Sequence, residues 1–241
     1  MSRTRLILLG LLAVVAAGAA IASTSGAEPP PPTSCMTVTS APAYCVAGAP
    51  LASGATEKFE GTNSGASILK ATVSMVKIEI RCEVGKSKGN IEGGAGGTVG
   101  KSTVTDTFEG CKMIKPTNCK LTATSEKEIK TAELKGELGL TAGRVEDELE
   151  SKTSAFAGVG IEGQETSCVI SHVGEEKTFS VTGSQLCEVD SSNSAAEKEE
   201  PTHKIICKTS GSSLKIGGKA EITSEATVKL TSGKDWSVKE T

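Results

Sequence analysis

The segment 76–84 constrains the fold most, because apolar and charged residues alternate through it without interruption. Its five apolar residues run from Val76 to Val84, and the four residues between them are all charged. Successive side chains of a β-strand point to opposite faces, so a period of two separates these two sets. The segment therefore predicts a strand with one buried face.

Weaker versions of this pattern recur, separated by clusters of Gly, Ser, Asn and Pro that are typical of turns. Residues 126–138 are the main ambiguity: Ser125 precedes charged residues and could cap a short helix, whereas Gly136 and Gly139 favour a strand. Many short strands predict an all-β fold, with an antiparallel barrel preferred to a sandwich. Besides 76–84, the expected strands are 102–109, 120–123, 128–138, 144–150, 156–162, 167–171, 178–182, 203–207, 213–216, 220–223 and 227–231.

The N-terminus has the layout of a bacterial secretory signal peptide. Two arginines within the first five residues precede an uncharged apolar run, 6–20, which is shorter than the roughly 20 residues of a membrane span. Small residues favour cleavage after Ala22, with Ala27 as the alternative. We therefore expect a protein that is secreted or displayed on the cell surface, with no membrane span in the mature chain.

The eight cysteines all follow this segment, and an even number in an exported chain predicts up to four disulfides. The chain lacks the C-x-x-C spacing of a zinc site, so we expect no bound metal. Proximity along the chain favours the pairs Cys35–Cys45 and Cys111–Cys119, and the pairing of the other four cysteines is left open. The expected disulfide residues are Cys35, Cys45, Cys82, Cys111, Cys119, Cys168, Cys187 and Cys207.

These features divide the chain into a signal peptide (1–22), a tether (23–55) and a single antiparallel β domain (56–241). The tether contains four consecutive prolines, which favour a stiff extended chain, and a small Cys35/Cys45 loop. Aromatic residues make up only 2% of the chain, which predicts a small-residue, aliphatic core assisted by disulfides.

The charge of the mature chain argues against two classes of partner. Removing residues 1–22 leaves 24 basic and 29 acidic residues, a net charge of −5. A mildly acidic chain has no electrostatic footprint for nucleic acid or for anionic lipid.

Two motifs resemble catalytic or nucleotide-binding signatures. Residues 95–102 end in Gly-Lys-Ser like a phosphate-binding loop, but the alternating, β-branched sequence that follows predicts a strand where that loop requires a helix. We interpret this segment as a flexible hairpin loop. Ser67 with Lys70, and Ser212 with Lys215, have the Ser-x-x-Lys spacing of penicillin-recognising enzymes, but both pairs lie in strand-like sequence.

For the remaining polar residues, too, we predict no catalytic, cofactor-binding or metal-binding role. His172 and His203 are expected in exposed loops without a catalytic role. The acidic run 146–150 is interpreted as a solvated strand face in preference to the paired carboxylates of a glycosidase. The polar stretch 191–201 is expected to be an exposed loop, and the spacing of the acidic residues within 190–200 fits no calcium loop.

Several short motifs resemble a group of uncharacterised, secreted, β-rich proteins of soil actinobacteria. The resemblance covers the chain from Phe59 to the C-terminus and implies an exported, disulfide-bearing β domain, with no activity attached. The motifs are Ile80-Arg81-Cys82, Gly89-Asn90-Ile91-Glu92-Gly93, Phe108-Glu109-Gly110-Cys111, Asn118-Cys119, Ile206-Cys207-Lys208 and residues 228–237.

Together these observations predict an exported, non-enzymatic protein that binds an extracellular or cell-surface partner or serves as a structural component of the cell envelope. A small-molecule carrier is the alternative, and it requires a barrel cavity of about 300 Å³ or more. A secreted hydrolase is the third hypothesis, and it requires a cleft that joins His172 or His203 to a serine and a carboxylate.

Overall fold

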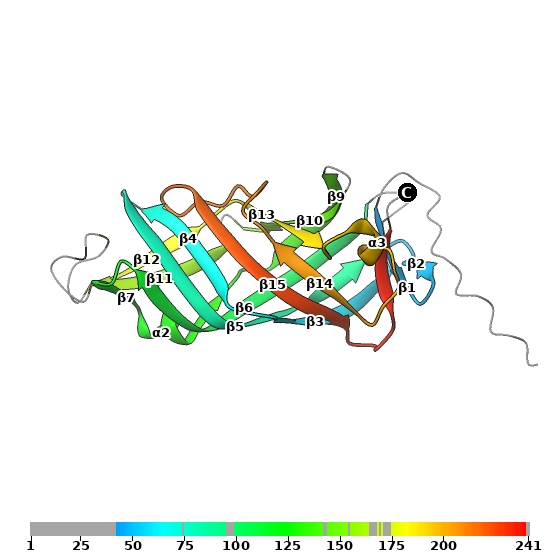
Figure 1. Cartoon of the computed structure of the whole chain (residues 1–241), viewed down its shortest axis with the longest axis horizontal. Coiled ribbons are helices and arrows are strands. Elements are labelled where there is room, and N and C mark those ends of the chain that lie inside the picture. Colours follow the sequence, from blue (N-terminus) through cyan, green and yellow to red (C-terminus); the bar gives the residue numbers. More distant parts are fainter. Residues whose placement is uncertain are drawn as a thin grey trace, which may run out of the picture. The chain divides into compact units, whose positions relative to one another are not determined.

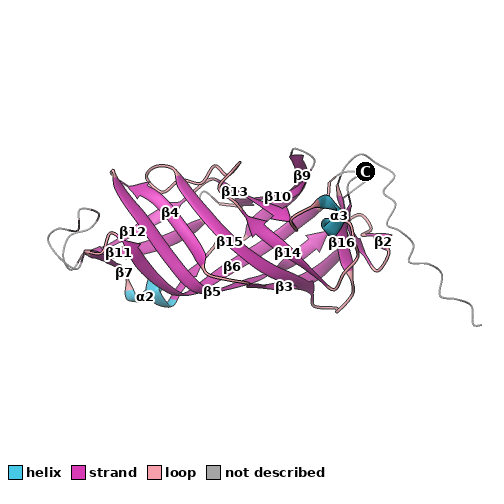
Figure 2. Ribbon diagram, in the orientation of Figure 1, coloured by secondary structure: helices cyan, strands magenta, loops and turns pink. Residues whose placement is uncertain are grey.

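The fold is all-β, as predicted, and its centre is a closed, eight-stranded antiparallel barrel (Figures 1 and 2). The computed structural model describes residues 42–73, 75–94, 99–141, 144–153, 155–163, 168, 170 and 175–239. All of these residues belong to one compact unit. The expected signal peptide and the proline run lie outside the described residues.

One ten-stranded sheet forms the barrel wall. The sheet follows the order β15, β14, β13, β10, β9, β6 and β5, with β8 added to β6. Strands β3 and β4 share the eighth position, because both pair with β5 on one side and with β15 on the other. The bounds are β3 (Thr56–Asn63), β4 (Ser67–Val73), β5 (Val76–Glu92), β6 (Lys101–Lys115), β8 (Glu128–Lys130), β9 (Leu134–Thr141), β10 (Arg144–Ser151), β13 (Ser184–Val189), β14 (Thr202–Cys207) and β15 (Ala220–Leu230).

Small three-stranded sheets lie at the two ends of the barrel (Figure 1). At one end, β1 (Ala43–Val46) pairs with β2 (Ala49–Pro50) and with the C-terminal strand β16 (Trp236–Lys239). At the other end are β7 (Cys119–Leu121), β11 (Ala157–Gly163) and β12 (Glu176–Val181). Residues 43–50 therefore belong to the folded domain, which corrects their assignment to the tether: Tyr44 and Cys45 are buried, and a chain that pairs with β16 cannot act as a spacer.

The long strands β5 and β6 change the face that points inward part-way along their length. In β5, Ile78, Ile80 and Cys82 are buried as the alternation predicts, but Val84 is 41% exposed. The opposite strand has Gly110 in the left-handed region, with a φ of 61°, which a residue without a Cβ adopts readily. Gly85, Ser87 and Ile91 line one interior space, whereas Ile80 and Cys82, before the change of face, line another.

Several expected strand boundaries need correction. The ambiguous segment 126–138 contains both structures: α2 (Ala123–Lys127) leads into β8 and β9, and Thr122, not Ser125, is its N-cap. The expected strands 220–223 and 227–231 form one continuous strand, β15, whereas 213–216 makes only an isolated bridge at Lys215. The loop 191–201 contains a four-residue helix, α3 (Asn193–Ala196). Within the described ranges, no helix has the length and apolar character needed to cross a membrane.

Two disulfides join neighbouring strands of the barrel wall. Cys82 bonds to Cys111 across β5 and β6, and Cys187 bonds to Cys207 across β13 and β14. Cys119 bonds to Cys168, so the predicted pair Cys111–Cys119 is wrong. Opposite residues of an antiparallel pair have Cβ atoms about 5 Å apart, so strand register decides the pairings Cys82–Cys111 and Cys187–Cys207. Cys45 is also disulfide-bonded, and its predicted partner Cys35 lies outside the described residues.

Candidate functional site

The barrel encloses a cavity of about 80 Å³ on the side of the β1–β16 sheet. Tyr44 and Trp236, from that sheet, form part of its lining, and the disulfide between Cys187 and Cys207 borders it as well. A second space of about 40 Å³ lies further along the interior, and Phe108 contributes to the lining of both. Both spaces are far below the roughly 300 Å³ that a barrel carrier needs.

Asp147 lines the cavity from β10 and is the most unusual polar group in the barrel. Its Oδ2 atom accepts hydrogen bonds from Ser102 Oγ at 2.7 Å and from the Tyr44 hydroxyl at 3.4 Å. Its Oδ1 atom is buried and has no hydrogen-bond partner in the part of the chain that the structure describes. A buried carboxylate oxygen without a partner is costly, so this atom marks a site that the protein itself leaves incomplete.

Glycines make room for this arrangement. A Cβ atom on Gly136, in β9, would collide with Ser102 Oγ and with both carboxylate oxygens of Asp147. A Cβ atom on Gly100 would lie 2.8 Å from the Tyr44 ring. Both side chains that contact Asp147 therefore depend on a neighbouring glycine for their position.

A second carboxylate, Asp106 on β6, lines the same cavity. Its Oδ1 atom accepts a hydrogen bond from Ser87 Oγ at 2.5 Å. Lys86 is the third charged residue among those described in the lining, but its side chain is 49% exposed and forms an ion pair with Glu109 at 2.6 Å. The cavity wall therefore carries two acidic groups that no basic side chain of the lining neutralises.

Burial controls the ionisation of these groups. It raises the pKa of Asp147 to about 6, and the hydrogen bonds from Ser102 and Tyr44 oppose this rise only in part. Burial also raises the pKa of Asp106, with partial opposition from Ser87. The pKa of Tyr44 lies well above its usual value, first because the ring is buried and second because Asp147 is negatively charged. At neutral pH, Tyr44 is therefore a hydrogen-bond donor and Asp147 an anion.

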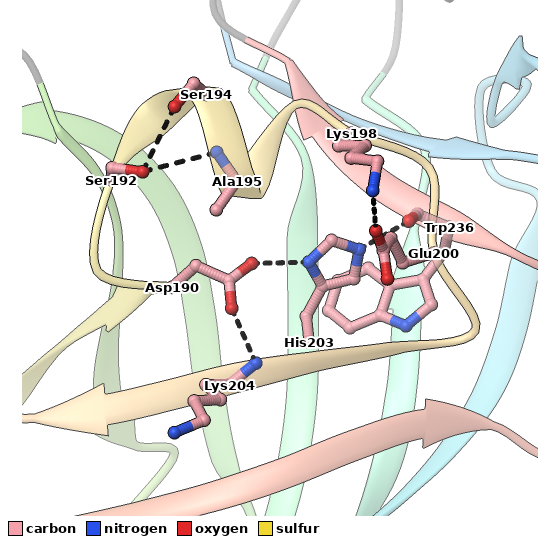
Figure 3. Close-up of polar contacts among 9 residues, drawn as sticks. All are labelled: Asp190, Ser192, Ser194, Ala195, Lys198, Glu200, His203, Lys204 and Trp236. Atoms are coloured by element: carbon pink, nitrogen blue, oxygen red, sulfur yellow. Dashed lines mark hydrogen bonds and ion pairs between the residues drawn. The ribbon is translucent and has the colours of Figure 1, made fainter.

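A buried histidine contacts Trp236, one of the residues that line the cavity (Figure 3). His203 is 2% exposed and lies in β14. Its Nδ1 atom is 2.5 Å from Asp190 Oδ2, and its Nε2 atom is 2.6 Å from the main-chain oxygen of Trp236. The imidazole also meets the Trp236 indole edge-on, with ring centroids 4.4 Å apart. Asp190 further accepts a hydrogen bond from the main-chain nitrogen of Lys204 at 2.9 Å.

This geometry corrects the expectation that His203 is an exposed loop residue. Each ring nitrogen lies within hydrogen-bond distance of an oxygen atom, so both nitrogens are engaged within the fold. Neither nitrogen is available to take a proton from a serine, although a carboxylate is present. His203 therefore anchors β16, and with it Trp236, at the end of the barrel. His172 lies outside the described residues.

The other motifs form no catalytic site. Ser67 is buried in β4 while Lys70 is exposed, because residues three apart on a strand point to opposite faces. Residues 95–98 of the Gly-Lys-Ser loop lie outside the described residues, and Lys101 and Ser102 begin a strand. Ser212 donates its hydroxyl to a main-chain oxygen and lies outside any helix. Within the described ranges, His, Cys, Asp and Glu side chains nowhere gather in a group of three or more that could hold a metal ion.

The acidic run on β10 is only partly the solvated face that the sequence predicts. Glu148 and Glu150 are exposed and border a shallow outer groove of about 810 Å³. Glu146 borders the same groove but is only 7% exposed. The groove also contains lysines, among them Lys101 and Lys135, and this mixture of charges indicates no particular ligand.

Comparison with known proteins adds nothing to this geometry. No protein-family model, curated protein or solved structure matches the chain. The candidate site therefore has to be argued from its own chemistry.

Sequence reasoning missed both carboxylates, although a signal is present. Asp147 occupies the middle of an apolar alternation, two residues from Val145 and from Leu149, and both of these neighbours are buried. Asp106 has the same position between Val104 and Phe108. An acidic residue in the inward register of a strand is placed in the core, and this pattern is more informative than the acidic run itself.

Proposed function

We propose that the protein is an exported, non-enzymatic binding protein that acts outside the cytoplasm, with the barrel cavity as its binding site. The observation that carries this proposal is the unpartnered, buried Oδ1 atom of Asp147, a residue that lines a cavity together with Tyr44 and Trp236. A barrel that served only as a scaffold would be more stable with an apolar residue at this position. Carboxyl groups with a raised pKa inside a cavity are typical of functional sites.

Three observations support the other parts of the proposal. The three described disulfides fit an extracellular environment, in agreement with the signal-peptide layout of residues 1–22. Both ring nitrogens of His203, the histidine that the structure describes, are engaged by Asp190 and Trp236 and cannot serve a serine nucleophile, which favours binding over hydrolysis. The cavity volume favours a very small ligand over the larger ligand of a carrier.

A structural role in the cell envelope is the second candidate. It is favoured by the cross-linking of the wall at Cys82–Cys111 and Cys187–Cys207, and by how little space the interior leaves. In this case the cavity would have no ligand.

Export and binding are tested separately. Expression of the full chain in a secreting bacterial host, followed by mass spectrometry, is expected to give an extracellular protein that begins at Ser23 and has no free thiol. An uncleaved, cytoplasmic protein would contradict export.

For binding, the purified protein is titrated with molecules of at most about four non-hydrogen atoms, including a cation, an anion and a neutral compound. Nuclear magnetic resonance shifts at Tyr44 and Trp236 report on the cavity. Shifts with at least one class support a binding protein, whereas no response to any of them supports the structural role instead.

A further inference from the structure

The cavity that we propose as the binding site also has a defined charge preference. Its described lining contains two carboxylates, Asp106 and Asp147, and its one basic residue, Lys86, is occupied by Glu109. Ser102 and Tyr44 both donate to the same oxygen, Oδ2 of Asp147, which leaves Oδ1 without a donor. What Asp147 Oδ1 lacks is a hydrogen-bond donor, and a positively charged donor forms the stronger bond to a carboxylate.

Aromatic rings are concentrated around the same space. The chain has only six aromatic residues, namely one Trp, one Tyr and four Phe, and four of these six line this cavity. They are Tyr44, Phe59, Phe108 and Trp236, from four different strands. The Tyr44 and Trp236 rings have centroids 6.3 Å apart and planes inclined at 47°, so they form two adjoining walls.

Aromatic faces next to carboxylates recognise a particular chemistry. The negative face of each ring attracts a cation within about 6 Å of its centroid, and alkylated ammonium groups are bound in this way in aromatic cages. An apolar neutral ligand would use the rings but leave the carboxylates unpaired, and an anion would be repelled by both. An alkylammonium ion uses both kinds of group.

The volume limits the size of the cation. At about 30 Å³ for each water-sized group, a cavity of about 80 Å³ has room for roughly three such groups. This admits methylated or short-chain ammonium ions with two to about four non-hydrogen atoms, and it excludes larger amines unless only their head group enters.

We propose that the barrel cavity binds a small alkylammonium ion between the carboxylate of Asp147 and the aromatic walls formed by Tyr44 and Trp236. This inference rests on the proposed binding function and specifies its ligand class. Asp147 is the primary anion, because its free oxygen requires a donor, and Asp106 adds a second negative charge to the same space.

The test uses three probes of nearly equal size and shape: trimethylammonium, 2-propanol and acetate, each with about four non-hydrogen atoms around one centre. The ligand-efficiency ceiling for so few atoms corresponds to a Kd of about 40 µM at best, so titrations need to extend well into the millimolar range. About 0.15 M salt suppresses binding to exposed carboxylates such as Glu148. Chemical shifts of the Tyr44 and Trp236 rings report binding in the cavity.

Three variants make the test specific. D147N is isosteric and removes the charge, D106N removes the second charge, and D235N removes an exposed charge outside the cavity lining. We expect trimethylammonium to bind about ten-fold or more tightly than 2-propanol and acetate, D147N to weaken it by about ten-fold or more, and D235N to leave it unchanged. The spectrum of each variant without ligand shows whether the fold is intact.

Each remaining outcome overturns a defined part of the reasoning. If 2-propanol or acetate binds as tightly as trimethylammonium, the cation preference is wrong but the binding function stands. If trimethylammonium binds equally to D147N, or shifts only exposed residues, the assigned site is wrong. If no probe shifts the cavity signals, both the inference and the proposed binding function fail.

Discussion

Replacing Asp147 by Asn is expected to stabilise the protein at neutral and alkaline pH, although it alters the candidate site. The pKa of Asp147 is about 6 in the folded protein, against an ordinary value of 3.8 that applies to the unfolded chain. The folded state thus binds the proton more tightly, so this group's contribution to stability is complete below about pH 3.8 and is lost as the pH rises to about 6. A difference of about 2 pKa units corresponds to about 3 kcal/mol.

D147N removes that dependence, because the amide stays neutral at every pH. At about pH 8 the variant is expected to be more stable by up to about 3 kcal/mol, or by roughly 6–12 °C in Tm for a domain of this size. At about pH 3.5 the two proteins are expected to have equal stability, since Asp147 is then protonated in both states. The difference in unfolding free energy between variant and parent cancels the contributions of all other titrating groups.

The assay is urea unfolding of the oxidised protein at a series of pH values, followed by circular dichroism and by the fluorescence of Trp236, the single tryptophan. D235N, which alters an exposed aspartate, is the matched control and is expected to change stability by less than about 0.5 kcal/mol. The reasoning is refuted if D147N is no more stable than the parent at about pH 8, or if its advantage persists unchanged at about pH 3.5. Either result would mean that Asp147 is solvated or paired in the folded protein.

Three further variants test the rest of the site. H203A is expected to lose about 3 kcal/mol in urea unfolding, since it removes the partner of Asp190 Oδ2 and the packing of the imidazole against Trp236, and H203Q is expected to lose less; a loss below about 1 kcal/mol for H203A would show that the anchor is unimportant. Removing the disulfide with C82A/C111A is expected to lower stability by about 3–4 kcal/mol for a sequence separation of 29 residues, and an unchanged denaturation midpoint would contradict this pairing. G136A is expected to lose about 1–3 kcal/mol through collision with the Asp147 carboxylate, whereas G139A, on the same strand with open space around it, is expected to change stability by less than about 0.5 kcal/mol; equal Tm values for the two would contradict the close approach.

The sequence predicted the wall of the barrel better than its contents. Alternation is a local property, so the segment 76–84 indicates a strand without reference to any other part of the chain. The exposure of Val84 was not predictable in this way, because both β5 and its partner β6, near Gly110, change the face that points inward. The pairing of Cys82 with Cys111 likewise depends on the β5–β6 register.

The candidate site combines local and non-local signals. The inward register of Asp147 can be read from its neighbours Val145 and Leu149. Its contact with Tyr44 cannot be read from the sequence in the same way. Tyr44 lies 103 positions from Asp147, in a segment that the sequence assigns to the tether. The exposed-loop prediction for His203 was wrong for the same reason. Its neighbours in the sequence, such as Lys204, are polar and exposed, but its ring contacts Trp236, which lies 33 positions further along the chain in another strand.

Of the six buried side-chain atoms without a hydrogen-bond partner among the described residues, three belong to residues that line the cavity; the others are on Glu146, Gln185 and Ser237. Among the described residues, Ser67 Oγ, Asp147 Oδ1 and Trp236 Nε1 are buried without a hydrogen-bond partner and belong to side chains that line the same cavity. Each such group destabilises the fold by about 1–3 kcal/mol. The disulfide between Cys187 and Cys207 borders this cavity and contributes about 3 kcal/mol in the opposite direction by restricting the unfolded chain. A wall reinforced beside a cavity that keeps a costly unpaired carboxylate oxygen is the arrangement expected when Asp147 serves a ligand and the fold tolerates its destabilising effect.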